Sequence, residues 1–288
     1  MLDAISPRLP TRIFFVLAVG LITELLLSSP LPVPEGKGPH VVFLIGEREY
    51  RTNETLPSFA EKELIPRGVR VSYVLAHPKR LHYFPNIELI ADADLVFLSI
   101  RRRNPPLEQL SLLKEYLDKG HPLVGIRTTS HAFGLRRRQP PPKGHTTWEN
   151  FDQEVLGATY RGHLDKESAN MGKCFFEINR QALQHPILKG LTLSREVTRS
   201  SLYRSNPLME STTVLAYGGI TDRPEREPVA WINQYKNASI FYTSLGHPQD
   251  FNLPIFRQLL INGIFWALGE DVPEIPKKER PYGAPGAR

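Results

Sequence analysis

The stretch Pro-Leu-Val-Gly-Ile-Arg-Thr-Thr-Ser-His-Ala-Phe at 122–133 constrains the fold more than any other part of this sequence. Its residues at 123–126 are apolar, the next ones are polar, and helix-compatible residues resume at Ser130. This pattern predicts a buried strand, a tight turn and the start of a helix. In an open α/β sheet, ligands gather at the carboxyl ends of the strands, and a sharp strand-to-helix turn is also where α/β hydrolases present their nucleophile. The residue at that point is Arg127.

The chain before this turn alternates between expected strands and expected helices. Continuous apolar runs predict buried strands at 40–45, 69–75 and 94–99. Apolar residues spaced by three to four predict helices at 55–64 and 106–119. Such alternation predicts a parallel sheet covered by helices on both faces. The expected fold is therefore α/β, with a doubly wound, mostly parallel sheet.

The chain after the turn is expected to continue with shorter elements. Helices are expected at 148–156 and 255–268, and strands at 174–178, 214–217, 229–232 and 239–244. A turn at 236–237 separates the last two strands, so they are expected to pair as a hairpin.

Both ends of the chain are expected to lie outside this domain. Arg8 and Arg12 precede an apolar run at 13–22, which is the pattern of a secretory signal. The alternative for 1–38 is an uncleaved membrane tether followed by a spacer. Residues 39–270 form the expected domain, and 271–288, rich in Pro, Lys and Gly, form an expected tail. The sequence thus predicts an exported protein, periplasmic or extracellular.

Composition and missing motifs exclude several classes of function. The net charge of +6 includes two short arginine runs, at 101–103 and 136–138, but no nucleic-acid-binding signature accompanies them, so we expect no nucleic-acid partner. A lone cysteine, Cys174, excludes an internal disulfide and a cysteine-rich zinc or iron–sulfur site. The absence of Walker A, Gly-x-Gly-x-x-Gly and His-Glu-x-x-His motifs argues against nucleotide hydrolysis, NAD-dependent redox chemistry and zincin proteolysis.

Polar side chains gather in the loops that follow or flank the expected strands. The candidates are Glu47, Tyr50, Arg101, Arg127, Ser130, His131, His163 and His247. Because the carboxyl ends of parallel strands meet at one edge of a sheet, several of these side chains are expected to converge there. Trp148 borders the proline-rich loop and is the tryptophan best placed to face a ligand.

Two segments resemble class I glutamine amidotransferases. The sequence at 122–131 is similar to their nucleophile elbow, and 240–250 is similar to the strand that carries their catalytic histidine. His247 falls at the family's histidine, Gln249 at its acid and Arg127 at its cysteine. The resemblance implies their flavodoxin-like architecture. It does not imply their chemistry, because a guanidinium cannot replace a thiolate nucleophile and an amide cannot hold an imidazolium electrostatically. We therefore expect no glutaminase activity.

A closer resemblance is to the ThuA-like (trehalose utilisation) family, over roughly 40–270. The similar segments are Gly-Ile-Arg-Thr-Thr-Ser-His-Ala-Phe at 125–133, Trp-Glu-Asn-Phe-Asp at 148–152, Tyr-Arg-Gly-His at 160–163, Leu-Tyr-Arg at 202–204, Phe-Tyr-Thr-Ser-Leu-Gly-His at 241–247 and Leu-Ile-Asn-Gly-Ile-Phe-Trp-Ala-Leu-Gly at 260–269. This family shares the amidotransferase-like fold without its cysteine. The resemblance implies a link to sugar metabolism, with a small sugar or glycoside as the partner.

Each candidate residue has a functional and a structural interpretation. His131, His163 and His247 fit acid/base groups or ligands of a divalent metal such as zinc, and equally fit buried or capping histidines. Arg127 fits an anion or a polarised oxygen, where it would stabilise developing negative charge, and equally a salt bridge to Glu47 or another nearby carboxylate.

Two hypotheses for function follow. The first is an exported enzyme that acts on a sugar or glycoside as a hydrolase or isomerase, with catalytic His247, His131 and Arg127. Glu47, Tyr50, Arg101, Ser130, Trp148 and His163 would then bind the substrate. The second is a carbohydrate-binding or scaffold protein without catalytic activity. The first requires Arg127, His131, His163 and His247 to come together.

Overall fold

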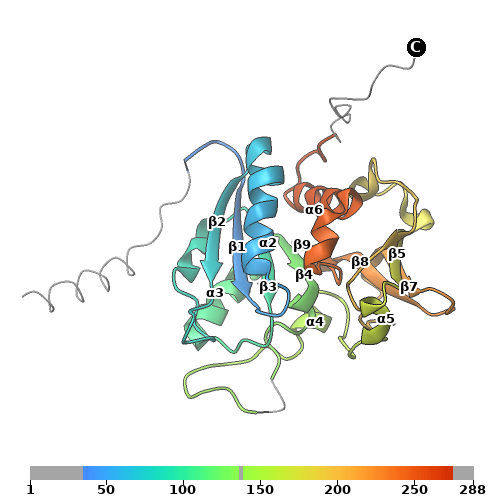
Figure 1. The fold of residues 1–288 in the computed structure, drawn as a ribbon. Helices are drawn as coiled ribbons and strands as arrows, with labels where there is room; N and C mark the ends of the chain where they lie inside the picture. The colour runs from blue at the N-terminus through green and yellow to red at the C-terminus, as the bar shows by residue number, and fades with distance from the viewer. Residues whose placement is uncertain (1–34, 136–138, 275–288) are drawn as a thin grey trace, which may run out of the picture. The chain divides into compact units, whose positions relative to one another are not determined.

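One mixed sheet organises the part of the chain that the computed structural model describes, residues 35–135 and 139–274. These residues all belong to the unit Val33–Arg288. Their nine strands follow the order β2-β1-β3-β4-β9-β8-β7-β5-β6 (Figure 1). The signal or tether expected at 1–38 and the tail at 271–288 fall almost entirely outside the described residues. Within these, no helix is both long enough and apolar enough to cross a membrane.

The strands and helices have the following bounds. The strands are β1 His40–Gly46, β2 Arg70–Leu75, β3 Leu95–Ile100, β4 Leu123–Ile126, β5 Cys174–Ile178, β6 Glu196–Val197, β7 Thr213–Ile220, β8 Arg226–Tyr235 and β9 Ala238–Thr243. The α-helices are α2 Thr52–Phe59, α3 Leu107–Asp118, α4 Phe151–Glu154, α5 Lys166–Asn170 and α6 Pro254–Ala267.

The sheet is parallel in one half and antiparallel in the other. Strands β2, β1, β3, β4 and β9 pair in parallel, as the alternation of strands and helices predicts. Strands β9, β8, β7, β5 and β6 pair antiparallel, and β8 and β9 form the expected hairpin. The prediction of a mostly parallel sheet is therefore corrected to a mixed sheet. Parallel neighbours need a long crossover, whereas short connections such as 221–225 and 236–237 join strands only as antiparallel neighbours.

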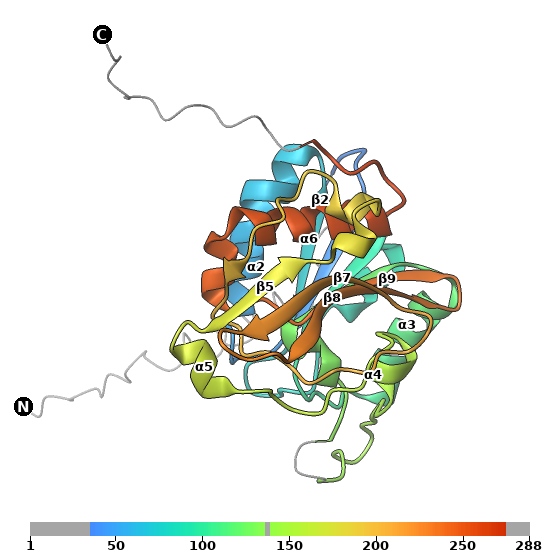
Figure 2. The ribbon, with the colours of Figure 1, turned by 90° about the vertical axis from the view of Figure 1, so that its right-hand side faces the viewer.

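Helices cover both faces of the parallel half, as predicted. Figure 2 shows α2 and α6 together on one side of the sheet and α3 and α4 on the other. Strand β1 serves both layers because successive side chains point to opposite faces. Val41 and Phe43 pack in the cluster with α2 and α6, while Val42 and Leu44 pack in the cluster with α3 and α4.

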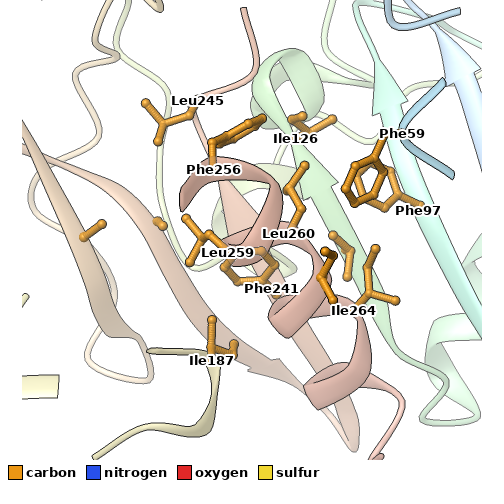
Figure 3. Packing of buried hydrophobic residues seen from close by; sticks show 14 of the residues in the cluster. Phe59, Phe97, Ile126, Ile187, Phe241, Leu245, Phe256, Leu259, Leu260 and Ile264 are labelled. Carbon is orange, nitrogen blue, oxygen red and sulfur yellow. The ribbon is translucent and has the colours of Figure 1, made fainter. Parts of the chain in front are cut away.

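The core beneath α6 is packed closely against β4 and β9. Figure 3 shows Leu260 and Ile264 of α6 directed at Phe241 of β9 and Ile126 of β4. A Cβ atom at Gly263 would lie 2.2 Å from the Phe241 ring, so only glycine lets the helix approach the sheet this closely. This packing fixes the ends of β4 and β9 side by side.

Three expected helices differ from the prediction. The helix expected at 55–64 starts at Thr52 and continues as a π-helical turn over Ala60–Leu64. The helix expected at 148–156 is reduced to α4. The helix expected from Ser130 is only a 3₁₀ turn, Arg127–His131, because the Thr129 hydroxyl bonds to the carbonyls of Leu98 (2.6 Å) and Ile126 (2.8 Å) and ties the turn to the sheet.

Replacing Leu260 by Ala is expected to lower the free energy of unfolding by about 2–5 kcal/mol, because the side chain is fully buried and leaves a cavity. Denaturation with urea measures the change. Leu107→Ala is the matched control, since Leu107 also lies on a helix but is 60% exposed; its effect should stay within about 0.5 kcal/mol. Equal losses for the two variants would show that α6 does not support the core in this way.

Candidate functional site

The ends of β4 and β9 place Arg127 at the centre of the candidate site. Ile126 pairs in register with Thr243, so Arg127 and Ser244 leave the sheet side by side. Arg127 has φ +49°, a left-handed conformation that a residue other than glycine rarely adopts. The Tyr242 hydroxyl donates to the Arg127 carbonyl at 2.6 Å and helps to hold this turn. The predicted sharp turn after the central strand is thus present.

The Arg127 guanidinium is buried, at 1% exposure, among neutral groups. Nη1 donates to the carbonyls of Ser201 (2.9 Å) and Ser244 (2.6 Å). Nη2 donates to the hydroxyls of Tyr50 (3.1 Å) and Ser201 (2.9 Å). The guanidinium carbon also lies 4.6 Å from the centre of the Tyr50 ring and 4.3 Å from that of Tyr203.

This environment does not match the structural interpretation of Arg127 as one half of a salt bridge to Glu47 or another nearby carboxylate. Among the ion pairs of the described residues, none involves Arg127. Glu47 instead accepts from the backbone of Glu49, Tyr50 and Thr52 and from the Thr52 hydroxyl. With its polar contacts to protein groups and almost no exposed surface, Arg127 organises the site from below and acts on a ligand only through its charge.

A short antiparallel contact between two later segments of the chain completes the site. His163 and Tyr203 form an isolated β-bridge. On either side of it, the Leu164 N–H donates to the Leu202 carbonyl (2.8 Å) and the Arg204 N–H to the Gly162 carbonyl (2.9 Å). This pairing brings two ring-bearing segments, 160–164 and 201–204, over the Arg127 turn.

Tyrosine rings connect the three candidate histidines to Arg127. His131 stacks on Tyr160, with 4.4 Å between ring centres, and His163 meets Tyr203 edge-on at 4.9 Å. Tyr160 and Tyr203 are themselves 4.8 Å apart. On the other side, the rings of Tyr50 and His247 are 6.4 Å apart. We call Tyr50, Arg127, His131, Tyr160, His163, Ser201, Tyr203 and His247 the Arg127 site.

The Arg127 site has a buried layer and an accessible layer. Tyr50, Arg127, Ser201 and Tyr203 are buried. The rings of His131, Tyr160, His163 and His247 are half-buried and lie between this layer and solvent. The Ser201 hydroxyl links the layers, because it accepts from Arg127 and lies 2.7 Å from Nδ1 of His163. A ligand would therefore meet imidazole and phenol rings, with a fixed positive charge behind them.

His247 is held by a buried carboxylate that does not touch its ring. Asp250 accepts from the N–H groups of Gly246 (3.0 Å) and His247 (3.1 Å). Nδ1 of His247 accepts from the Gln249 N–H at 3.3 Å, so the ring caps the following turn and the proton of a neutral ring sits on Nε2. The preceding Gly246 has φ +121°, and a Cβ there would lie 2.6 Å from Ile126. This geometry differs from a catalytic triad, in which Nδ1 donates to an acid.

The histidines of the Arg127 site are held in the neutral form. Burial lowers the pKa of His131 well below its usual value, and Arg102, Arg101 and Arg127 lower it further. Burial, with Lys166 and Arg127, lowers the pKa of His163 to about 4. Burial and Arg127 also lower the pKa of His247, against an opposing effect of Asp250. Near pH 7 each ring therefore carries one N–H donor and one lone pair, and the lone pair of His247 is already taken by the Gln249 N–H.

The described residues contain no group of three or more His, Cys, Asp or Glu side chains that is arranged to hold a metal ion. His131, His163 and His247 lie around tyrosine rings rather than around a common point. Their arrangement does not fit the divalent metal site that their residue types suggest, and we assign them no metal.

The other residues expected in the site have separate places. Glu47 caps its own loop, as described above. Arg101 is paired with Glu49, with 2.7 Å between Nε and the carboxylate, and lies near enough to His131 and His163 to affect their pKa values. The Ser130 hydroxyl lies 3.1 Å from Nδ1 of His131. Trp148 is only 6% exposed and packs in the cluster with α3 and α4, where its N–H donates to Glu154.

Sequence reasoning did not assign Ser201, Tyr203 or Tyr160 to the site. Tyr160 and Tyr203 belong to segments already noted for their family resemblance, Tyr-Arg-Gly-His and Leu-Tyr-Arg. That resemblance could have indicated that Tyr160 and Tyr203 belong to the site. Ser201 carries no comparable pattern.

Comparison with known proteins identifies a family for this architecture. The sequence model of the ThuA family, described as trehalose utilisation, matches residues 82–267. A ThuA-like protein of Parabacteroides merdae has a similar structure, with a TM-score of 0.59 and 16% identity over 84% of this chain and 94% of that chain. A cytoplasmic protein of Salmonella typhimurium LT2 is also similar, with a TM-score of 0.50 and 15% identity over 79% of this chain and 99% of that one. No curated protein matches the sequence.

Replacing Arg127 by Lys is expected to lower the free energy of unfolding by about 1–3 kcal/mol, because one ammonium cannot replace four hydrogen bonds from two guanidinium nitrogens. Denaturation with urea measures this loss. Arg101→Lys is the control, since Arg101 is 35% exposed and its change should stay within about 0.5 kcal/mol. A smaller loss for Arg127→Lys than for Arg101→Lys would contradict the organising role of Arg127.

The His163 ring is expected to titrate near pH 4, far below the usual value of 6.5. Because the folded state disfavours the charged ring, His163 contributes stability above pH 6.5, and this contribution is lost as the pH falls toward 4. NMR titration of the imidazole measures the midpoint. Unfolding of wild type and His163→Gln at pH 7 and pH 4.5 should show the larger loss in wild type. A midpoint near 6.5 would show that the ring is solvated.

Proposed function

The chain belongs to the ThuA (trehalose utilisation) family, and from this premise we propose that it is an enzyme that acts on a sugar or glycoside by acid/base chemistry. The observation that carries the proposal is the accessible layer of the Arg127 site. There, His131, His163 and Tyr160 lie in ring contact, at the side of the sheet where the parallel strands end. This is where α/β sheets commonly bind ligands.

The accessible layer supplies the contacts that a sugar needs. Neutral imidazoles donate to and accept from hydroxyl groups, and a half-buried tyrosine ring offers an apolar surface to the carbon face of a sugar. A neutral imidazole carries a lone pair that can accept a proton from a substrate hydroxyl. We therefore assign His163 and His131 to proton transfer and Tyr160 to substrate binding.

Arg127 and Asp250 are positioning residues in this proposal. Arg127 fixes Ser201, which in turn holds the His163 ring at 2.7 Å. Asp250 fixes the backbone of His247. The charge of Arg127 favours a substrate oxygen that gains negative charge, and it acts through the intervening hydroxyl and phenol groups.

We further propose that the fold is of the class I glutamine amidotransferase kind without its chemistry. Support comes from the left-handed turn at Arg127 and from His247 following the neighbouring strand, the places where those enzymes carry cysteine and histidine. No thiol stands at the turn, so incubation with glutamine should release no ammonia.

The test is turnover of a panel of sugars and glycosides, trehalose included, by the full chain. For a substrate that is turned over, His163→Gln should lower kcat/KM by about 10²–10⁴-fold, the usual contribution of a general acid or base. His121→Gln is the matched control, because His121 stacks on Tyr116 away from the site and should leave kcat/KM unchanged.

The alternative is a carbohydrate-binding protein without catalysis, which is favoured by the absence of a cysteine at the Arg127 turn. Binding of a panel member that Tyr160→Ala abolishes, with no turnover at any pH from 5 to 9, would support this alternative. Absence of both binding and turnover across the panel would contradict both functions.

A further inference from the structure

A cavity lies beside the loop that connects β3 to α3, apart from the Arg127 site. It has a volume of about 580 Å³, which suits a small organic ligand. The side chains that matter for its chemistry are Lys79, Arg80, His82, Tyr83 and His145. None of the residues that line it belongs to the Arg127 site.

The two histidines of this cavity are set in complementary tautomers by one residue, Asn104. The Asn104 N–H donates to Nδ1 of His82 at 2.9 Å, so the proton of this ring is on Nε2. The Asn104 carbonyl accepts from Nδ1 of His145 at 2.7 Å, so the neutral His145 ring has a lone pair on Nε2. With ring centres 6.1 Å apart, His82 offers a donor and His145 an acceptor.

Two residues of the cavity lining carry positive charge. Lys79 and Arg80 line the cavity and are exposed, and no Asp or Glu is among its described lining residues. Arg80 lies over the Tyr83 ring, with its guanidinium carbon 4.3 Å from the ring centre. The N–H groups of Lys79 and Arg80 donate to Nδ1 of His77, and the Tyr83 N–H donates to the Arg80 carbonyl. The cationic loop is therefore held in shape before any ligand binds.

We propose that this cavity binds a small polyhydroxy anion, in which a phosphate or carboxylate meets Lys79 and Arg80 and a hydroxyl meets His82 and His145. A hydroxyl both accepts and donates, so it fits the donor of His82 and the acceptor of His145 together. An anionic group fits two cations with no competing carboxylate. Sugar phosphates and sugar acids have this chemistry; the choice of sugars rests on the proposed function, whereas the choice of a hydroxylated anion does not.

Calorimetric titration of the full chain with glucose, glucose 6-phosphate, glucuronate, glycerol 3-phosphate and inorganic phosphate tests the inference. At least one hydroxylated anion should bind about tenfold or more tightly than both glucose and inorganic phosphate. Preference for glucose 6-phosphate or for glucuronate identifies phosphate or carboxylate as the anionic group. Arg80→Gln should weaken this binding about tenfold, whereas Lys119→Gln, which removes one exposed charge outside the cavity, should not.

The outcomes separate this inference from the proposed function. Binding by the His163→Gln variant, unchanged from wild type, places the ligand outside the Arg127 site. Binding of glycerol 3-phosphate alone upholds the cavity even when no sugar is turned over. Equal effects of Arg80→Gln and Lys119→Gln, or glucose binding as tightly as its 6-phosphate, would overturn the inference.

Discussion

The Arg127 site depends on a buried positive charge that neutral groups hold in place. In the described part of the chain, this guanidinium has no carboxylate partner. Burying a charge is costly unless its donors are satisfied. The two terminal nitrogens of Arg127 meet two carbonyls and two hydroxyls and the guanidinium lies over two aromatic rings, while its buried Nε has no hydrogen-bond partner among the described residues. These partners come from segments far apart in the sequence. Arg127 therefore fixes the loops after β1, β4 and β9 together with the segment at 201–203, and its uncompensated charge favours neutral histidines around it.

The arrangement of the strands explains why the Arg127 charge lies at the ends of β4 and β9. The close contact of Gly263 with Phe241 holds α6 against β4 and β9, and the register of Ile126 with Thr243 sets their ends level. A turn in the left-handed conformation then directs the Arg127 side chain across the end of β9 rather than along a helix. This geometry presents a cation at the ends of the strands.

The sequence predicted the parallel half of the sheet and the Arg127 turn because long apolar runs and a sharp change of polarity mark them directly. It also predicted that several polar side chains converge where the strands end, and tyrosine rings lie between His131, His163, His247 and Arg127. It did not predict the mixed sheet, because β6 has only two residues and the order of β5, β7 and β8 depends on pairing between distant segments. Ser201 escaped prediction for the same reason. Trp148 lies in the core because its indole N–H finds a partner, Glu154, within the same turn of chain.

The short pairing of 160–164 with 202–204 divides the site into two parts that tolerate substitutions to different degrees. Arg127, Tyr50 and Ser244 follow strands of the parallel half, where a substitution disturbs the core, whereas Tyr203 lies in the paired segments and Ser201 directly precedes one of them. The rings of His163 and Tyr160, which a ligand would meet, lie in the paired segments 160–164 and 202–204. A few hydrogen bonds and the Ser201 side chain connect these segments to the parallel half of the sheet. Residues 160–164 can therefore change in evolution, and with them the preferred ligand, while the positive charge of Arg127 behind them stays in place.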